Sequence, residues 1–316
     1  MRILLTGTRG QVGNALKPLL DGHGTIIAPP TAEFDLSKPE LLTGQLESLK
    51  PDLIINPAAY TAVDRAEDER ELAFLVNAKG PEAIAKWAAA NRVPLVHFST
   101  DYVFNGSGDR LWREDSPTEP LSAYGASKLA GDLAIQAAGG AHLIVRTSWV
   151  YAAKGTNFLR TIARLAGERK ELRIVADQIG APTTAQAIAS AVAGIVLPNL
   201  TTLHDQLARR GGVVNLVCAG ETSWHGFATA IVGGLRSRGV TLAVENIVPI
   251  ATADFPTKAV RPGNSRLDLS RLKAQFGVAM PTWQEALAHE LDAYVQLGTP
   301  AHAEQQAQLS LSGSIL

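Results

Sequence analysis

Two residues four positions apart, Tyr124 and Lys128 in the stretch "YGASK", have the types and the spacing of an acid–base pair. On a helix, side chains four apart lie on one face. A phenol with an ordinary pKa of about 10 donates its proton poorly at neutral pH, and a neighbouring ammonium favours the phenolate and lowers that pKa. The pair therefore predicts an acid that protonates a carbonyl group as it is reduced. A surface helix that merely carries a tyrosine and a lysine would give the same pattern.

The stretch "STDYVFNG", residues 99–106, begins like the end of a buried strand and then turns polar. In open parallel sheets the ligand lies beyond the carboxyl ends of the strands, so polar residues there are placed to touch it. We predict that Thr100 hydrogen-bonds the carbonyl oxygen that Tyr124 protonates, and that Asp101 and Tyr102 extend toward the rest of the substrate. A strand end capped by small polar residues would explain Thr100 alone equally well.

The segment "TGTRGQVG" places Gly7, Gly10 and Gly13 three residues apart between a predicted strand and a predicted helix. Glycine lets the backbone approach a pyrophosphate, and the N–H groups at the start of a helix attract its charge. The spacing differs from the G-x-G-x-x-G fingerprint of dinucleotide sites, and an ordinary glycine-rich turn is the alternative. The position of the turn, at the first strand-to-helix junction, favours a dinucleotide site.

The next strand carries a signal for the choice of cofactor. Its stretch "GTIIAPP" ends without the acidic residue that would bind the ribose 2′-hydroxyl of NAD. Arg9 lies inside the glycine turn, where it could meet a 2′-phosphate. We therefore predict NADPH as the preferred cofactor, with NADH also accepted.

Apolar runs and helical stretches alternate along the first half of the chain. The runs at 2–7, 24–29, 51–60, 93–100, 142–151 and 213–220 predict strands, and the stretches 12–20 and 72–90 predict helices. Continuous apolar strands are typical of a parallel sheet that helices cover on both faces. We predict an α/β fold: a Rossmann-like doubly wound parallel sheet with a smaller C-terminal substrate-binding domain.

The pattern also predicts domain bounds. Residues 1–150 are expected to form the dinucleotide-binding domain, and a later segment near 182–218 is expected to return to it. Residues 151–297 are expected to form mainly the substrate-binding domain. The stretch 298–316 lacks a clear apolar face after its proline and is predicted to be a loose tail.

Composition argues against several classes of partner. Charged residues make up 19% of the 316 residues and the net charge is −1, so the clustered Lys and Arg that nucleic acids or acidic membranes require are not indicated. The single cysteine, Cys218, allows no internal disulfide and suits a reducing compartment. No apolar run approaches the roughly 18 residues of a membrane span. We predict a cytoplasmic protein with a small-molecule ligand.

The order of the motifs, a glycine turn, then Ser-Thr, then Tyr-x-x-x-Lys, resembles the extended short-chain dehydrogenase/reductase family. Within that family, the stretches "STDYVFNG", "YGASKLAGD", "RTSWVYAAKGTNF", "DQIGAPT" and "RPGNSRLD" are similar to the dTDP-4-dehydrorhamnose reductases. The resemblance covers residues 1–294. It implies NAD(P)H-dependent reduction of the C4 ketone of dTDP-4-dehydro-L-rhamnose to dTDP-L-rhamnose, with Tyr124 as the general acid.

The resemblance also implies roles for individual residues. Thr100, Tyr124 and Lys128 would be catalytic, and Lys128 would hold the nicotinamide ribose as well. With Tyr124, Lys128 and Arg9, the cofactor-binding candidates are Gly7, Gly10, Gln11, Val12, Asp35, Ala58, Ala59 and Thr61. The substrate-binding candidates are Thr100, Asp101, Tyr102, Trp149, Asn157, Arg261 and Asn264. Arg266 is a second candidate for the diphosphate, because an arginine bonds phosphate bidentately.

Two other functions remain open. A dehydratase or epimerase of the same family usually has a second acidic residue beside the one that follows the catalytic threonine, whereas here Asp101 is followed by Tyr102. A related group with this fold serves as the non-catalytic regulatory subunit of methionine adenosyltransferase. Intact Thr100, Tyr124 and Lys128 favour catalysis.

A metal is not expected. Some relatives in this reductase group are thought to dimerise through a magnesium ion held by glutamates, and the matching positions here are Ala15, Gln186 and Ala293. Hard cations need several oxygen ligands, preferably charged. We therefore predict a monomer, or a dimer not bridged by metal. Glu285 or Glu290 is the alternative ligand on the same helical stretch.

Overall fold

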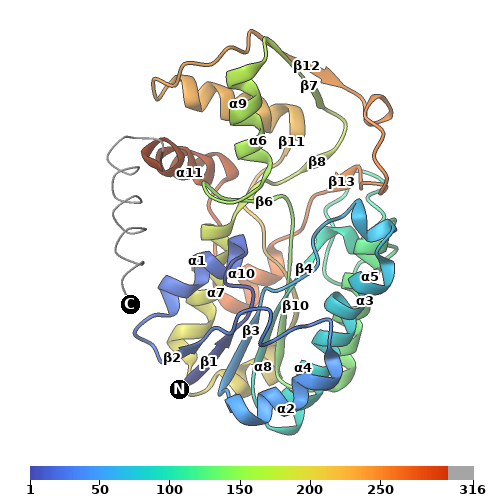
Figure 1. Ribbon diagram of the computed structural model, residues 1–316, viewed down its shortest axis with the longest axis vertical. Helices are drawn as coiled ribbons and strands as arrows, with labels where there is room; N and C mark the ends of the chain where they lie inside the picture. Colours follow the sequence, from blue (N-terminus) through green and yellow to red (C-terminus); the bar gives the residue numbers. More distant parts are fainter. Residues whose placement is uncertain (298–316) are drawn as a thin grey trace.

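A six-stranded parallel sheet forms the centre of the molecule (Figure 1). The computed structural model describes residues 1–297. The strands are β1 (Arg2–Leu5), β2 (Thr25–Ile27), β3 (Leu53–Asn56), β4 (Leu95–Thr100), β5 (His142–Thr147) and β10 (Gly212–Asn215). Their order is β10-β5-β4-β3-β1-β2, and each neighbouring pair is parallel. These are the six runs that the sequence predicts as strands, so the doubly wound, Rossmann-like sheet is confirmed.

Helices cover both faces of this sheet. They are α1 (Gln11–Leu20), α2 (Pro39–Leu49), α3 (Arg70–Phe74), α4 (Gly80–Ala90), α5 (Ala123–Ala138), α7 (Ala185–Val196), α8 (Leu203–Arg210) and α10 (Ser270–Phe276). Alternate strand residues point to opposite faces. Ile3 and Ile55 therefore pack in a core with α1 and α7, while Leu4 and Ile54 pack in another with α2, α4 and α5.

The stretch 72–90, predicted as one helix, is divided in three. A π-helical turn, η2 (Leu75–Lys79), lies between α3 and α4. It buries Asn77, whose side chain accepts a hydrogen bond from Tyr60 N at 2.8 Å and donates to Ser127 Oγ at 3.0 Å. The turn thus ties the chain after β3 to α5.

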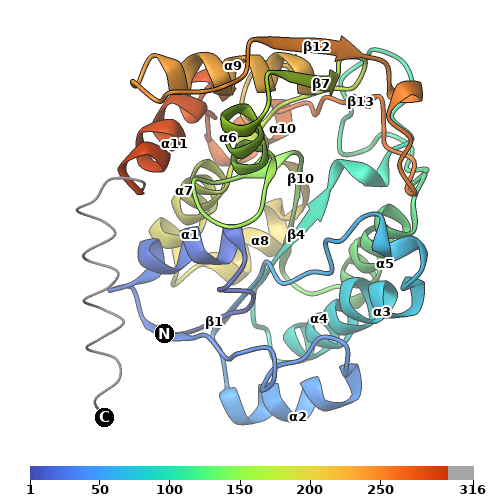
Figure 2. The same ribbon diagram turned by 45° about the horizontal axis from the view of Figure 1, so that its top comes forward.

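A second, smaller core lies beyond the carboxyl ends of the strands (Figure 2). Its helices are α6 (Phe158–Glu168), α9 (Trp224–Arg236) and α11 (Trp283–Leu297). Its short strands are β6 (Val150–Tyr151) paired with β9 (Thr183–Thr184), β7 (Glu171–Val175) paired with β12 (Asn246–Ile250), and β8 (Ile179–Gly180) paired with β11 (Thr222–Ser223) and β13 (Asn264–Ser265). Buried Tyr151, Phe227 and Trp283 centre this core.

The predicted domain bounds remain a proposal. In the structure α7 packs in the core beneath the sheet and β10 pairs with β5 in it. Leu272 of α10 also packs in that core, although it falls in the range assigned mainly to the substrate-binding domain. The predicted tail, 298–316, lies outside the described residues.

No single helix among residues 1–297 is long and apolar enough to cross a membrane. One pair, Ala185–Asn199 with Leu203–Arg210, passes that test by length and composition only, and it is bent by 118°.

Candidate functional site

The glycine turn after β1 has a backbone that a larger residue could not adopt. Gly7 has φ +58°, and a Cβ there would lie 2.8 Å from Ala58 N. A Cβ on Gly13 would lie 2.3 Å from the Gly7 carbonyl oxygen. Helix α1 then begins at Gln11 with Gly10 as its N-cap and no side-chain cap, so its first N–H groups face outward unpaired by a side chain. This cradle fits a pyrophosphate.

The turn lies against the chain that follows β3, at the point where the strand order reverses. Ala58 N donates to Thr6 Oγ1 at 3.3 Å, which brings Ala58 beside Gly7. Ligands of doubly wound sheets bind in the crevice at such a switch point. The candidates Ala59 and Thr61 continue this segment, and Val12 lies one residue into α1.

Asp35 lies in the loop after β2 and is already hydrogen-bonded. Its Oδ1 accepts from Ser37 N at 2.9 Å and from Ser37 Oγ at 2.7 Å, and Lys38 Nζ lies 3.6 Å away. Partial burial would raise the pKa of Asp35, but the Ser37 hydrogen bonds and Lys38 outweigh it and lower that pKa. The side chain thus presents a carboxylate that is charged at neutral pH.

Thr100 ends the central strand β4 and caps the short helix η3 (Asp101–Val103). Its Oγ1 accepts from Tyr102 N at 3.2 Å and donates to Asp101 Oδ1 at 3.0 Å. Burial raises the pKa of Asp101 to about 6, although hydrogen bonds from Ser265 and Thr100 lower it in part. A polar cluster therefore forms at the end of β4, as the motif "STDYVFNG" predicts.

Tyr124 stands in the first turn of α5, next to this cluster. Its ring meets the Tyr102 ring edge-on, with centroids 5.5 Å apart. Burial raises the pKa of Tyr124; a hydrogen bond with Thr100 opposes the rise, and the charges of Asp101 and Asp132 add to it. This differs from the sequence-based expectation that Lys128 would lower the pKa, because the Lys128 ammonium is directed elsewhere.

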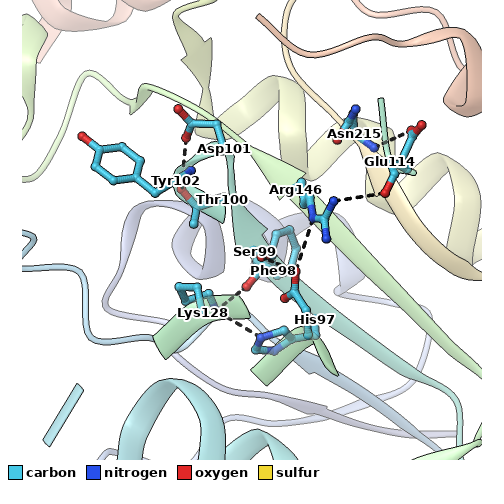
Figure 3. Close-up of polar contacts among 11 residues, drawn as sticks. His97, Phe98, Ser99, Thr100, Asp101, Tyr102, Glu114, Lys128, Arg146 and Asn215 are labelled. Carbon is cyan, nitrogen blue, oxygen red and sulfur yellow. Dashed lines mark hydrogen bonds and ion pairs between the residues drawn. The ribbon is translucent and has the colours of Figure 1, made fainter. Parts of the chain in front are cut away.

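Lys128 is buried beneath the cluster, with 2% of its surface exposed. Its Nζ donates to the Phe98 carbonyl oxygen at 2.6 Å and lies 3.1 Å from His97 Nε2 (Figure 3). Burial lowers the pKa of Lys128 to about 8, while the Asp132 carboxylate raises it. The lysine is therefore near its titration point at physiological pH.

A buried ion pair lies one turn further along α5. Asp132 Oδ2 accepts from Ser99 Oγ at 2.8 Å and from Arg146 Nε at 3.3 Å. Arg146 also donates to the Glu114 carbonyl oxygen at 3.3 Å (Figure 3). The sequence did not predict this pair. Arg146, a charged residue inside the apolar run 142–151, was the signal that a buried acidic partner is needed.

The substrate candidates divide into those near Tyr124 and those apart from it. Arg261 lies close enough to Tyr102 to lower the pKa of that phenol, although burial raises it more. The Arg261 guanidinium donates to both carboxylate oxygens of Asp64, at 3.2 and 2.8 Å. Tyr102 is therefore a neighbour of both Tyr124 and Arg261, and Arg261 already has an acidic partner.

The remaining candidates lie elsewhere. Trp149 has φ +49° and stacks on Trp224 with ring centroids 3.6 Å apart. Asn157 donates to Gln11 Oε1 at 3.0 Å and so joins α6 to the glycine turn. Asn264 is buried and donates to the Arg110 carbonyl oxygen at 2.7 Å. The structure thus groups Asn157 with the cofactor candidates and gives Asn264 backbone partners.

The doubly wound sheet, with a cradle for a pyrophosphate at its switch point, defines the class of Rossmann-fold dinucleotide-binding proteins. Comparison with family models is more specific: residues 1–296 match the RmlD substrate binding domain, and the chain belongs to that family.

Individual proteins that are similar to this chain support the same family. The dTDP-4-dehydrorhamnose reductase of Burkholderia thailandensis is 46% identical over 293 residues, 91% of this chain and 97% of the relative. That of Salmonella typhimurium is 44% identical, covering 90% of this chain and 95% of its own length. The crystal structure of the Clostridium acetobutylicum reductase matches with a TM-score of 0.83 and 33% identity, over 93% of this chain and 99% of that one. The Bacillus anthracis reductase, in complex with NADP, matches with a TM-score of 0.82 and 32% identity, over 92% and 99%.

Proposed function

We propose that this protein is an NADPH-dependent oxidoreductase that reduces the C4 ketone of dTDP-4-dehydro-L-rhamnose to dTDP-L-rhamnose. The observation that carries the proposal is the placement of Tyr124, in the first turn of α5 with its ring edge-on to Tyr102, beside Thr100 at the carboxyl end of β4, where a ketone oxygen can be held and protonated. The curated relatives named for this activity support it, because they align with about nine-tenths of the chain.

Each catalytic candidate has a distinct part in the proposed reaction. Reduced nicotinamide, when bound, supplies the hydride that adds to C4. Tyr124 gives its phenolic proton to the C4 oxygen, so that the C=O becomes CH–OH. Thr100 orients that oxygen through its hydroxyl, and Lys128 holds the nicotinamide ribose. A sugar alkoxide is a stronger base than a phenolate, so Tyr124 can act as the acid even though burial raises its pKa.

The proposed cofactor site combines the glycine turn with the chain after β3. Gly7, Gly10, Gln11 and Val12 would approach the pyrophosphate, with Ala58, Ala59 and Thr61 at the facing edge and Asp35 near the adenosine. Arg9 is exposed in the turn and supplies a positive charge for a 2′-phosphate. We expect kcat/KM to be higher with NADPH than with NADH, and both to be used. An equal or higher value with NADH would contradict this preference.

The proposed nucleotide-sugar site lies beside Tyr102, Tyr124 and Arg261. Asp101 is hydrogen-bonded to Thr100 next to Tyr102. Arg261 offers two parallel N–H groups, which suit a diphosphate. Trp149, Asn157 and Asn264 stay candidates for substrate binding, and Arg266, which pairs with Glu221 at 3.4 Å, is the second choice for the diphosphate.

The deciding experiment mixes the purified protein with dTDP-4-dehydrorhamnose and NADPH and follows the loss of reduced-nicotinamide absorbance, with the product identified by NMR. The proposal requires cofactor oxidation and one new CH–OH at C4. Loss of water or inversion at a sugar carbon, without net cofactor oxidation, would indicate a dehydratase or epimerase. Tight binding of both ligands without turnover would indicate a non-catalytic role, as in a regulatory subunit of the methionine adenosyltransferase type.

The cellular setting is also a proposal. The thiol of Cys218 is free and buried, which suits the reducing cytoplasm. The near-neutral net charge gives no basis for binding nucleic acid or a membrane surface.

A further inference from the structure

A row of polar side chains runs beneath the proposed site, inside an otherwise apolar sheet. Thr6 follows β1, Asn56 ends β3, and His97 lies directly opposite Asn56 on β4. Thr6 Oγ1 is 2.6 Å from Asn56 Oδ1, and Asn56 Nδ2 is 3.1 Å from His97 Nδ1. His97 Nε2 is 3.1 Å from Lys128 Nζ. The row therefore links the start of the glycine turn to the proposed catalytic lysine.

His97 must be neutral at the centre of this row. It is 1% exposed, and burial together with the Lys128 charge holds its pKa well below the ordinary value. A neutral imidazole has one N–H group and one acceptor nitrogen. Both ring nitrogens are hydrogen-bonded, so the tautomer of His97 is set by which neighbour donates and which accepts.

Two hydrogen-bond arrangements satisfy the side chains of this row. If Lys128 is an ammonium, it has no acceptor, so Nε2 accepts from it and the proton lies on Nδ1. Nδ1–H then donates to the Asn56 amide oxygen, and the amide NH₂ group donates to Thr6. If Lys128 is a neutral amine, Nε2–H donates to its lone pair, Nδ1 accepts from the amide NH₂ group, and the Thr6 hydroxyl donates to the amide oxygen. The second arrangement matches the placement of the Asn56 oxygen and nitrogen in the structure.

We propose that His97 is a positioning residue for Lys128: its Nε2 accepts from the ammonium and keeps it charged, and its tautomer switches together with the Asn56 amide when Lys128 loses its proton. This inference rests on the proposed function for its catalytic consequence. The proton that Lys128 loses goes to solvent, and the imidazole proton moves from Nδ1 to Nε2 without an imidazolium being formed.

Other charged groups near Lys128 also affect its protonation. Asp132 lies one turn along α5 and favours the ammonium, but it also pairs with Arg146 of β5. Asp101 of η3 acts on Tyr124 of α5, and neither of them contributes to the pKa shift of Lys128. None of these groups hydrogen-bonds Lys128 Nζ, whereas His97 and the Phe98 carbonyl oxygen do.

The first test needs no measurement of activity. Protein labelled with ¹⁵N at histidine is titrated without ligands, and the ring nitrogen shifts of His97 are followed by NMR; Lys128→Met provides the control. We expect His97 to stay neutral and to change from the Nδ1–H to the Nε2–H tautomer on a midpoint of about pH 8, and to show no change in Lys128→Met. A single tautomer throughout the titration in the parent protein, or an identical change in Lys128→Met, would overturn the proposal.

The second test asks whether His97 matters for turnover. His97→Leu removes the acceptor at similar volume, and His97→Gln retains an amide oxygen. Loss of one charge-assisted hydrogen bond moves a pKa by about one unit. With His97→Leu we expect the alkaline limb of kcat/KM to move about one unit to lower pH, because the ammonium is lost sooner, and His97→Gln to restore most of the shift.

His142→Gln on β5 is the matched control, since among the described residues the His142 side chain has a hydrogen bond only with the Gly140 carbonyl oxygen and none with Lys128. An unshifted limb in His97→Leu, or an equal shift in His142→Gln, would count against the proposal. If His97→Leu fails to fold, His97→Gln is measured alone. A shift of the alkaline limb by a full unit in His97→Gln would then count against the proposal. Absence of turnover in the parent protein would reject the proposed function, while the NMR titration would still decide the inference.

Discussion

At the residue scale, the proposed acid and its lysine are less directly coupled than their spacing in the sequence suggests. Tyr124 and Lys128 share a helix face, yet the lysine extends past the phenol to His97 and the Phe98 carbonyl oxygen. The side chain that lowers the pKa of Tyr124 is Thr100, not Lys128. In the proposal Thr100 orients the ketone oxygen, and to do so its one hydroxyl proton must turn from Asp101 Oδ1 to that oxygen.

The Tyr124→Phe variant tests the acid. We expect kcat to fall by about 10²- to 10⁴-fold, because general acid catalysis contributes that much. Dissociation constants for NADPH and dTDP should change by a few-fold at most, since the ring is kept. Tyr151→Phe removes a phenol that is buried in the second core, and it should retain parental kcat. Turnover of Tyr124→Phe within a few-fold of the parent would remove Tyr124 from the acid role.

At the element scale, the sequence predicted the strands and motifs that depend on residues near one another in the chain. It did not predict features that depend on contacts between residues far apart in the chain. Continuous apolar runs identified the strands of the central sheet, and the motifs after β1 and β4 identified its ligand edge. Nothing local signalled the π turn at 75–79, whose Asn77 bonds partners on other elements. The Asp64–Arg261 pair joins residues 197 positions apart, so no local pattern could reveal it.

The glycine turn offers a test with a matched control. In Gly13→Ala the new methyl group would lie 2.3 Å from the Gly7 carbonyl oxygen, so the turn and α1 must move apart. We expect NADPH affinity to fall at least tenfold, as measured by fluorescence titration. Gly44→Ala, in α2, adds the same methyl group where, within residues 1–297, no heavy atom beyond its chain neighbours and the backbone of its own helix lies within 4 Å. It should leave affinity unchanged and raise the free energy of unfolding by about 0.5–1 kcal/mol. Equal affinities for the parent and Gly13→Ala would contradict the cradle.

At the scale of the whole molecule, two loops meet beside the proposed substrate site. Asp64, in the loop after β3, accepts from Ala259 N at 3.1 Å and from the Arg261 guanidinium, both in the loop before β13. Lys258 pairs with Asp68 next to this contact. The guanidinium proposed to hold the diphosphate is thus bonded to a carboxylate, which a dianionic ligand must displace or tolerate.

The Asp64→Asn variant measures that competition. The side chains of Arg261 and Asp64 are 26% and 45% exposed, and such pairs are worth about 0.2–1 kcal/mol. We therefore expect dTDP to bind about 1.4- to fivefold more tightly to Asp64→Asn, and much more weakly to Arg261→Ala, by calorimetry. Asp68→Asn makes the same change in net charge without touching Arg261, and it should bind dTDP like the parent. Weaker binding by Asp64→Asn would show instead that Asp64 positions Arg261.

The last prediction concerns metal and assembly. Ala15, Gln186 and Ala293, the positions that match the glutamates of metal-bridged relatives, line one groove of about 1340 Å³ together with Glu285 and Glu290. Both glutamates are already engaged: Glu290 Oε2 accepts from Ala153 N at 2.6 Å, and Glu285 Oε2 accepts from Thr282 N and Oγ1 at 2.9 and 2.7 Å. Within residues 1–297 there is no group of three His, Cys, Asp or Glu side chains that could hold a metal. We therefore expect excess EDTA to change neither the sedimentation coefficient nor the rate of NADPH oxidation, and Glu290→Gln to respond to EDTA as the parent does. A fall in mass or rate with EDTA that magnesium restores would prove this prediction wrong, because hard cations bind only where several oxygen ligands are free.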